Sequence, residues 1–156
     1  NAFCPLPHRI EFVAEINGVF YYNDSKATNT GAVIGALAQF PENVILLAGG
    51  RDKGDDYRLL RGSVAGRVKK LIVFGESAIL LKEALEDLVG IIQVKSMEDA
   101  VCIAAGNAAS GDVVLLSPAC ASFDMFTSYG HRGNEFKKAV MALPDFCESQ
   151  QAEGVN

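Results

Sequence analysis

The chain has 156 residues, 49% of them hydrophobic and 21% charged, which is the size and composition of one globular domain with a core of its own. Its formal net charge is −5 and no run of basic residues is longer than two, so the positive surface that binds nucleic acid is missing and no nucleic-acid partner is expected. No apolar run reaches the about 20 residues of a membrane-spanning helix, so no membrane partner is expected either.

The four cysteines, Cys4, Cys102, Cys120 and Cys147, are scattered along the chain, with no C-x-x-C pair and no pair of histidines near them. This spacing argues against a structural zinc site and against a disulfide framework. Cysteines in apolar surroundings are typical of core residues in a reducing compartment. The sequence therefore predicts a cytoplasmic protein.

The first elements form a pattern typical of a β-hairpin. Apolar residues alternate with other residues from Ile10 to Ile16, as in a half-buried strand, and residues 19–22 supply the returning strand. Between them, Asn17 and Gly18 accept the two positive φ angles of a type I′ turn. An antiparallel hairpin is therefore expected at the start of the domain.

Beyond the hairpin, predicted strands alternate with predicted helices. Continuous apolar runs indicate strands at 44–48, 71–74, 91–94 and 113–116. Apolar residues at helical spacing indicate helices near 33–40, 81–88, 101–108 and 136–143, a weaker helix at 58–67, an N-cap at Ser96 and an end of the last helix at Pro144. Such alternation predicts an α/β fold, with a Rossmann-like, mostly parallel sheet of about six strands, helices on both faces and the antiparallel hairpin at the amino-terminal side.

Three loops follow three of the predicted strands: the first loop (residues 23–31), the second loop (49–55) and the third loop (117–126). The carboxyl ends of parallel strands lie along one edge of a sheet, and open α/β sheets bind their ligands there. We therefore expect the three loops to meet and to form the ligand site.

The first loop places acidic, basic and hydroxyl side chains in six successive positions. In one interpretation, Asp24, Ser25 or Thr28 is simply the N-cap of the next helix and Lys26 is a solvated charge. Capping needs only one such residue, so we favour a second interpretation. A carboxylate, an ammonium group and hydroxyls at the positive end of a helix suit an anionic or phosphorylated ligand with its metal.

The second loop begins with Gly49 and Gly50, but its spacing fits neither the Walker A motif nor G-x-G-x-x-G. In one interpretation the glycines form a tight turn whose charged neighbours are solvated. In the other, they let the backbone approach a ligand while Lys53 offers its charge to a carboxylate or phosphate. The pattern of this loop alone favours neither.

Cys120 in the third loop lies on a predicted turn between a strand and a helix, where a nucleophile could stand. A nucleophilic cysteine needs a general base within reach. The two histidines are badly placed for this, because His8 follows Pro7 in a linker-like segment and His131 lies near the start of a helix. Cys120 is therefore predicted to be a small packing residue.

The other residues of the third loop divide into donors and packing residues. Ser117, Ser122 and the amides at the start of the next helix are predicted to donate hydrogen bonds to a bound anion. Phe123 and Phe126 are predicted to pack in the core.

At these loops the sequence strongly resembles the carboxy-terminal domain of the Mur ligases, and within that family the enzymes that add D-glutamate. The segments that carry the resemblance are His-Arg-Ile-Glu (8–11), Asn-Asp-Ser-Lys-Ala-Thr-Asn (23–29), Gly-Gly-Arg-Asp-Lys-Gly (49–54) and Leu-Ser-Pro-Ala-Cys-Ala-Ser-Phe-Asp (116–124). The Asp-Asn-Pro-Arg motif expected of a diaminopimelate-adding relative is absent from the sequence.

The resemblance implies an ATP-dependent amide ligase of peptidoglycan synthesis, with residues 8–143 as its amino-acid-binding third domain, 1–7 as the remnant of an interdomain linker and 144–156 as a flexible tail. Such enzymes use ATP and Mg²⁺ to convert the carboxylate of UDP-N-acetylmuramoyl-L-alanine into an acyl phosphate, which the amine of D-glutamate attacks. In the family, the phosphate loop and a carbamylated, metal-binding lysine lie in the central domain, which this chain lacks together with the amino-terminal domain. This fragment is therefore expected to be inactive alone and to bind no cofactor tightly.

The resemblance also implies roles for individual residues. Those around D-glutamate would be Thr28, Lys53, Ser122, Phe123 and Tyr129. Lys53 would meet one carboxylate, and Ser122 with the amide of Phe123 would meet the other.

On the nucleotide side, the resemblance implies that Arg9 and Asp24 face the ribose of ATP and that Lys26 faces its phosphates. It implies no role for Arg51 or Asp52. It also implies no catalytic residue and no metal ligand within this chain.

Two alternatives remain open from the sequence. The chain could be a free-standing, doubly wound module that binds a phosphorylated ligand for binding or regulation, or it could belong to a Mur-type ligase for another amino acid. A phosphate-binding loop upstream in the same reading frame would exclude the first. Activity with different amino acids would decide the second.

Overall fold

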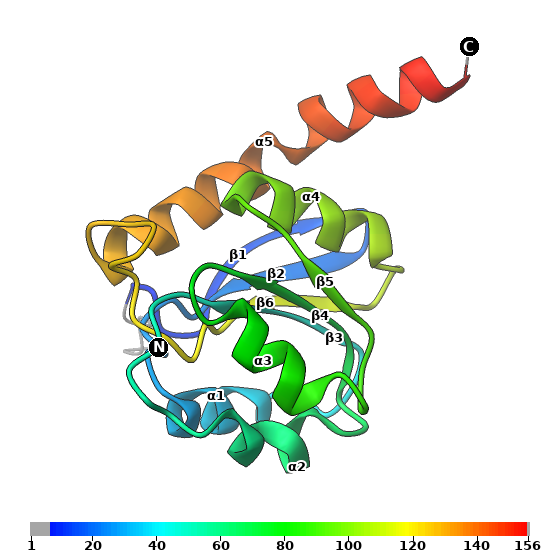
Figure 1. Ribbon diagram of the computed structural model, residues 1–156. Helices are drawn as coiled ribbons and strands as arrows, with labels where there is room; N and C mark the ends of the chain where they lie inside the picture. Colours follow the sequence, from blue (N-terminus) through cyan, green and yellow to red (C-terminus); the bar gives the residue numbers. More distant parts are fainter. Residues whose placement is uncertain (1–6, 156) are drawn as a thin grey trace, which may run out of the picture.

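The structure, a computed structural model, describes the backbone of residues 7–155 and the side chains as far as Leu143. Its centre is one six-stranded sheet in the order β1-β2-β6-β3-β4-β5 (Figure 1). The strands are β1 (Glu11–Ile16), β2 (Val19–Asn23), β3 (Val44–Gly49), β4 (Val68–Phe74), β5 (Ile91–Gln93) and β6 (Val113–Leu116). Only β1 and β2 pair antiparallel among these strands, and the other neighbours pair parallel. The predicted fold class is confirmed.

Helices cover both faces of the sheet (Figure 1). One face carries α1 (Thr30–Leu37), the 3₁₀ helix η1 (Tyr57–Leu60), α2 (Arg61–Val64) and α3 (Ala78–Leu85), and the other carries α4 (Met97–Asn107) and α5 (Tyr129–Val155). In β3, Leu46 packs with α1 and α3, whereas Ile45 and Leu47 pack with α4 and α5. Every residue of β3 is buried, which explains its continuous apolar run.

Two local signals place their elements as predicted. Asn17 and Gly18 have φ angles of 54° and 79°, as a type I′ hairpin turn requires. The side chain of Ser96 accepts a hydrogen bond from the amide of Asp99 at 3.0 Å and caps α4. Both signals depend only on neighbouring residues, so the sequence is sufficient to find them.

Two helices differ from the prediction. The weak helix expected at 58–67 is the pair η1 and α2, which ends before Gly66, a residue whose φ of 81° is not helical. Helix α5 begins at Tyr129 and continues to Val155, so the prediction that Pro144 ends it is wrong. A proline removes one backbone donor and bends a helix, but the helix can resume beyond it.

The predicted terminal segments lie largely outside the described residues. Of the expected linker remnant, 1–7, only Pro7 is described, and the side chains of the expected tail, 144–156, are not described. In the part of the chain that is described, no helix has both the length and the apolar character needed to cross a membrane.

Candidate functional site

The three loops meet at one edge of the sheet, as predicted. Strands β2, β6 and β3 are neighbours and run parallel, so the first, third and second loops leave the sheet side by side. Backbone hydrogen bonds join the loops: Ala119 N donates to Ala27 O at 2.9 Å, and Arg51 N donates to Ala121 O at 2.8 Å. Ala119 has a φ of 66°, which residues other than glycine rarely adopt, and such strain is typical of functional loops.

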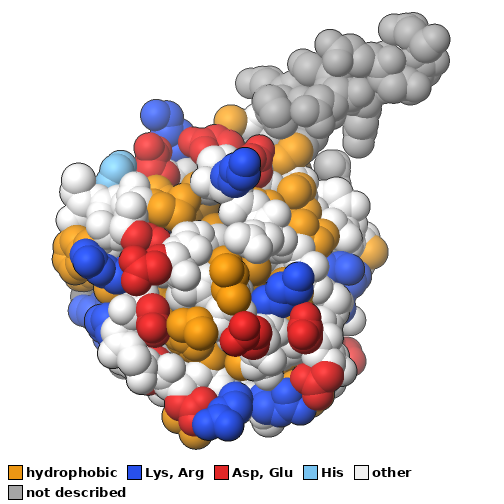
Figure 2. All heavy atoms as spheres, in the orientation of Figure 1, with side chains coloured by type: hydrophobic (Ala, Val, Ile, Leu, Met, Phe, Trp, Pro, Cys, Tyr) orange, Lys and Arg blue, Asp and Glu red, His pale blue; other side chains and the backbone are white. Residues whose placement is uncertain are grey.

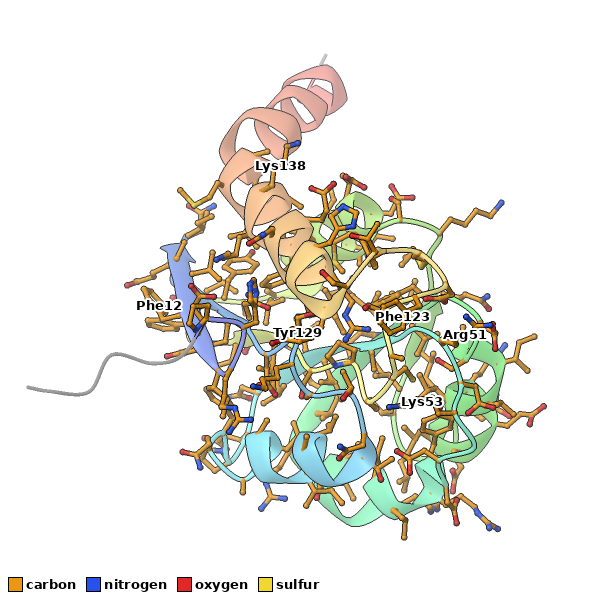
Figure 3. The ribbon with its side chains drawn as sticks, turned by 90° about the vertical axis from the view of Figure 1, so that its left-hand side faces the viewer. Phe12, Arg51, Lys53, Phe123, Tyr129 and Lys138 are labelled. Carbon is orange, nitrogen blue, oxygen red and sulfur yellow. The ribbon has the colours of Figure 1, made fainter. Side chains whose placement is uncertain are left out.

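A cavity of about 330 Å³, the three-loop cavity, opens between these loops and the start of α5 (Figure 3). Its lining residues are Thr28, Arg51, Lys53, Ala121, Ser122, Phe123 and Tyr129. They include all five residues that the family resemblance implies around an amino-acid ligand. The fold therefore brings together side chains that are far apart in the sequence.

Three polar side chains that line the three-loop cavity have no partner among the described residues. Ser122 is 1% exposed, and its hydroxyl has no hydrogen-bond partner among the described residues. Leaving a buried hydroxyl unpaired costs about 1–3 kcal/mol, so this group marks a place for a ligand or a water molecule. Arg51 and Lys53 are exposed and belong to none of the ion pairs in the described part of the chain. Two unpaired cations beside a buried hydroxyl suit a ligand with carboxylate groups.

Aromatic side chains form an exposed wall of the three-loop cavity. Phe123 is 63% exposed, so the prediction that it packs in the core is wrong. The reason is local: Ala121 is fixed by a bridge to the second loop, and Phe123 follows directly after the buried Ser122. Phe126 packs against the core cluster of α4 and α5, as predicted. The second exposed aromatic residue of the wall is Tyr129, which is 40% exposed.

A second cavity of about 220 Å³, the α1 cavity, lies between the segment before β1, the first loop and helix α1. Its lining residues are Arg9, Ile10, Asp24, Lys26, Ala27, Ala32, Gly35 and Ala36. They include the three residues that the resemblance implies on the nucleotide side. On the helix side, alanine and glycine leave the space open.

Asp24 is the buried carboxylate of the α1 cavity. It is 4% exposed, and its Oδ1 accepts from Ile10 N at 3.1 Å while its Oδ2 accepts from Ser117 Oγ at 2.8 Å. Burial raises the pKa of Asp24, and these two hydrogen bonds oppose the rise. The prediction that Ser117 donates to a ligand is wrong, because its hydroxyl is committed to Asp24. Asp24 therefore ties the first loop to the third loop and to the segment before β1.

The N-terminus of α1 is capped from within the protein. The side chain of Asn29 accepts from Ala32 N at 2.8 Å, and Asp55 Oδ2 accepts from Thr30 N at 2.8 Å. Asn29 is therefore the cap, rather than one of the three earlier candidates in the first loop, because the helix begins only at Thr30. With these two amides occupied, less of the helix end is available to an anion.

Cys120 is a packing residue, as predicted. It is 1% exposed, and its Sγ lies 3.4 Å from Tyr57 Oη and 3.1 Å from Ser77 Oγ. Burial raises the pKa of the thiol, so the nucleophilic thiolate is disfavoured. Among the described contacts, neither His8 nor His131 bonds to this thiol.

Arg132 is a residue of the site that none of the sequence patterns above identifies. It lies in the first turn of α5, is 0% exposed, and donates three hydrogen bonds to Ser25 of the first loop and Cys120 of the third. Burial lowers its pKa to about 10. The sequence does contain a signal for this burial. Arg132 lies four residues, or about one helical turn, before the apolar Phe136, so helical spacing places both residues on the same buried face.

Comparison with known proteins agrees with this geometry. The family model described as "Mur ligase, glutamate ligase domain" matches residues 8–120. The chain belongs to this family. A curated UDP-N-acetylmuramoylalanine--D-glutamate ligase of Desulfotalea psychrophila is 60% identical over 144 residues, covering 92% of this chain and 31% of the relative. A ligase of the same name from Bdellovibrio bacteriovorus is 51% identical over 140 residues, covering 90% and 30%. This Mur ligase domain thus spans about a third of the length of these relatives.

Solved structures share the fold of this Mur ligase domain. A murein peptide ligase from Psychrobacter arcticus superposes with a TM-score of 0.60 at 15% identity, covering 89% of this chain and 31% of that one. A bifunctional folylpolyglutamate synthase/dihydrofolate synthase from Yersinia pestis, complexed with AMPPNP and a Mn ion, superposes with a TM-score of 0.58 at 21% identity, covering 91% and 32%. At these identities the similarity establishes the fold alone.

Proposed function

We propose that this chain is the amino-acid-binding domain of a cytoplasmic, ATP-dependent ligase that adds D-glutamate to UDP-N-acetylmuramoyl-L-alanine in peptidoglycan synthesis. The observation that carries the proposal is the three-loop cavity, which is lined both by Lys53 and by the buried hydroxyl of Ser122, neither of which has a described ion-pair or hydrogen-bond partner. The names of the two relatives support the choice of amino acid.

D-Glutamate brings two carboxylates, and each must exchange water for partners in the cavity. Lys53 meets one carboxylate with its charge, and Ser122 Oγ with the amide of Phe123 meets the other. Hydrogen bonds to charged groups contribute about 1.5–3 kcal/mol each. Thr28 and the ring of Tyr129 complete the enclosure. Held in this way, the ligand presents its amine to the open side of the cavity.

The reaction joins that amine to an activated carboxyl group. ATP transfers its γ-phosphoryl group to the carboxylate of the nucleotide-linked substrate, the amine attacks the carbonyl carbon, and phosphate leaves as the amine loses a proton. A C–N bond forms and a C–O bond to the phosphate breaks. The residues of this chain bind and orient the amine, which is how proximity lowers the barrier.

The α1 cavity is the proposed nucleotide side of the domain. Arg9 and Asp24 face the ribose of ATP, and Lys26 supplies positive charge for its phosphates. No group of three or more His, Cys, Asp or Glu side chains among the described residues is arranged to hold a metal ion. In the complete enzyme, Mg²⁺ would offset the charge of the ATP phosphates.

The test uses the full-length gene product that contains this chain. We expect Lys53→Ala to lower kcat/KM for D-glutamate about tenfold to a hundredfold, and Ser122→Ala about tenfold, since each removes one partner of a carboxylate. Lys138→Ala is the matched control, because Lys138 is an exposed lysine of α5 away from the cavity (Figure 3). Wild-type kcat/KM in both cavity variants would sink the assignment.

The same protein separates the alternatives. Amide formation measured with D-glutamate, L-glutamate and L-alanine should occur with D-glutamate only. Preference for another amino acid would support the alternative that the protein is a Mur-type ligase for that amino acid. Absence of any ATP-dependent amide formation would favour a binding module.

A further inference from the structure

The first and third loops both line the three-loop cavity, and a buried arginine joins them in addition to the Ala119–Ala27 and Ser117–Asp24 hydrogen bonds. Arg132 Nε donates to Ser25 Oγ at 2.9 Å, Nη2 donates to Ser25 O at 2.7 Å, and Nη1 donates to Cys120 O at 2.9 Å. Ser25 lies three residues before Thr28, and Cys120 lies two residues before Ser122. The planar guanidinium therefore sets the separation of two residues that line the cavity.

The charge of Arg132 has no counter-ion in contact with it. The side chain is 0% exposed, its three acceptors are neutral oxygens, and no ion pair within the described residues includes it. Asp124 acts on it only through electrostatics at longer range, and Oδ2 of that carboxylate accepts from Glu76 N. A buried charge without a paired carboxylate is costly, and packing alone would be served by an apolar residue.

The guanidinium of Arg132 lies next to the backbone of the loops that line the three-loop cavity. A Cβ atom added to Gly50 would be 3.1 Å from Arg132 Nη1, so the guanidinium packs against the backbone of the second loop. The next residue, Arg51, and Ala121 of the third loop both line the cavity. An anion bound in the three-loop cavity would therefore be near the guanidinium of Arg132, with the loop backbone between them.

We propose that Arg132 is a positioning residue for amino-acid binding. It holds the first and third loops at the separation that the ligand requires, and its unpaired charge behind the wall favours an anionic ligand. The identity of that ligand rests on the proposed function. Arg132 acts through Ser25, Cys120 and the loops that they belong to, so its effect should fall on binding of the amino acid rather than on the chemical step.

Steady-state kinetics of the full-length gene product test this. We expect Arg132→Met to raise KM for D-glutamate about tenfold, with kcat and KM for UDP-N-acetylmuramoyl-L-alanine within about twofold of wild type. Arg132→Lys keeps the charge but loses the forked donors, so KM should rise only about threefold. A KM for D-glutamate within twofold of wild type in Arg132→Met would overturn the proposal. The proposal would also fail if Arg132→Met and Arg132→Lys lost kcat and affinity for both substrates to the same extent, because that result indicates a general loss of structure.

A second variant covers the case in which Arg132→Met does not fold. Ser25→Ala removes only the Nε acceptor and a hydrogen bond to the carbonyl of Tyr129. We expect KM for D-glutamate to rise about threefold, against no change for Ser96→Ala, a cap on α4 away from the three-loop cavity. Equal KM values in these two variants would overturn the proposal. If the wild-type protein shows no D-glutamate-dependent activity, the proposed function itself fails, which is a different result.

Discussion

The three-loop cavity and the α1 cavity lie at the same edge of the sheet, but they use their polar groups in opposite ways. In the three-loop cavity the Ser122 hydroxyl is buried without a described partner. In the α1 cavity the Asp24 carboxylate is buried with both oxygens hydrogen-bonded inside the protein. The first cavity offers its polar groups to a ligand, and the second uses its carboxylate to hold the loops. Loop stability is thus assigned to Asp24, and the proposed binding of the amino acid to other residues of the same three loops.

The largest effect expected from this division is on stability. Asp24→Ala leaves the amide of Ile10 and the hydroxyl of Ser117 without their acceptor in a buried place, and each unpaired group costs about 1–3 kcal/mol. We expect the free energy of unfolding of this chain to fall by about 3 kcal/mol in urea titrations. A loss below about 1 kcal/mol would show that Asp24 is not the tie between the loops.

A matched pair of serines sharpens the comparison. Ser117→Ala removes a donor to Asp24, so the free energy of unfolding should fall by about 1–2 kcal/mol. Ser122→Ala removes a buried hydroxyl without a described partner, so the free energy of unfolding should stay the same or rise while D-glutamate binding weakens. Equal destabilisation by the two changes would mean that Ser122 has a structural partner after all.

The sequence was sufficient for the fold because its signals are local and strong. The two central strands β3 and β6 are continuous apolar runs, and the hairpin is marked by its Asn17-Gly18 turn. Parallel strands place successive loops on one edge, so the meeting of the three loops follows from the strand pattern. Which side chains of the loops line the three-loop cavity came from the family resemblance instead, because the strand pattern places loops and not individual residues.

What the sequence could not supply are partners that only the packed structure creates. Ser117 and Ser122 lie in one short loop and look equivalent as donors, yet only tertiary contacts assign the first to Asp24. Phe123 is apolar, but its loop lies beyond the end of β6 and leaves it exposed. The buried position of Arg132 contradicts the ordinary preference of arginine for the surface, so composition points the wrong way there.

A pH experiment separates the charge of Asp24 from its hydrogen bonds. Because burial raises its pKa above the ordinary 3.8, the folded chain keeps a proton that the unfolded chain releases just above that pH. The proton-linked part of the contribution of Asp24 to stability is therefore fully present below pH 3.8 and falls as the pH rises through the raised pKa. The two hydrogen bonds that Asp24→Ala removes are a separate contribution. Asp24→Asn should flatten the dependence of unfolding free energy on pH in this window. An identical slope in the variant and the wild type would contradict the assignment.

The smallest effect concerns the contact between Tyr129 of the three-loop cavity and Lys26 of the α1 cavity. The ring of Tyr129 lines the three-loop cavity, and Lys26 Nζ of the α1 cavity lies 5.9 Å from the centre of that ring. A cation–π contact at an exposed site contributes about 0.5–1 kcal/mol. In the full-length protein, Tyr129→Leu should therefore raise KM for both D-glutamate and ATP by about twofold to fivefold. Tyr129→Phe keeps the ring and should leave both KM values within about twofold of wild type. If the phenylalanine variant loses as much D-glutamate affinity as the leucine variant, the hydroxyl itself contacts the amino acid and the ring does not link the two cavities.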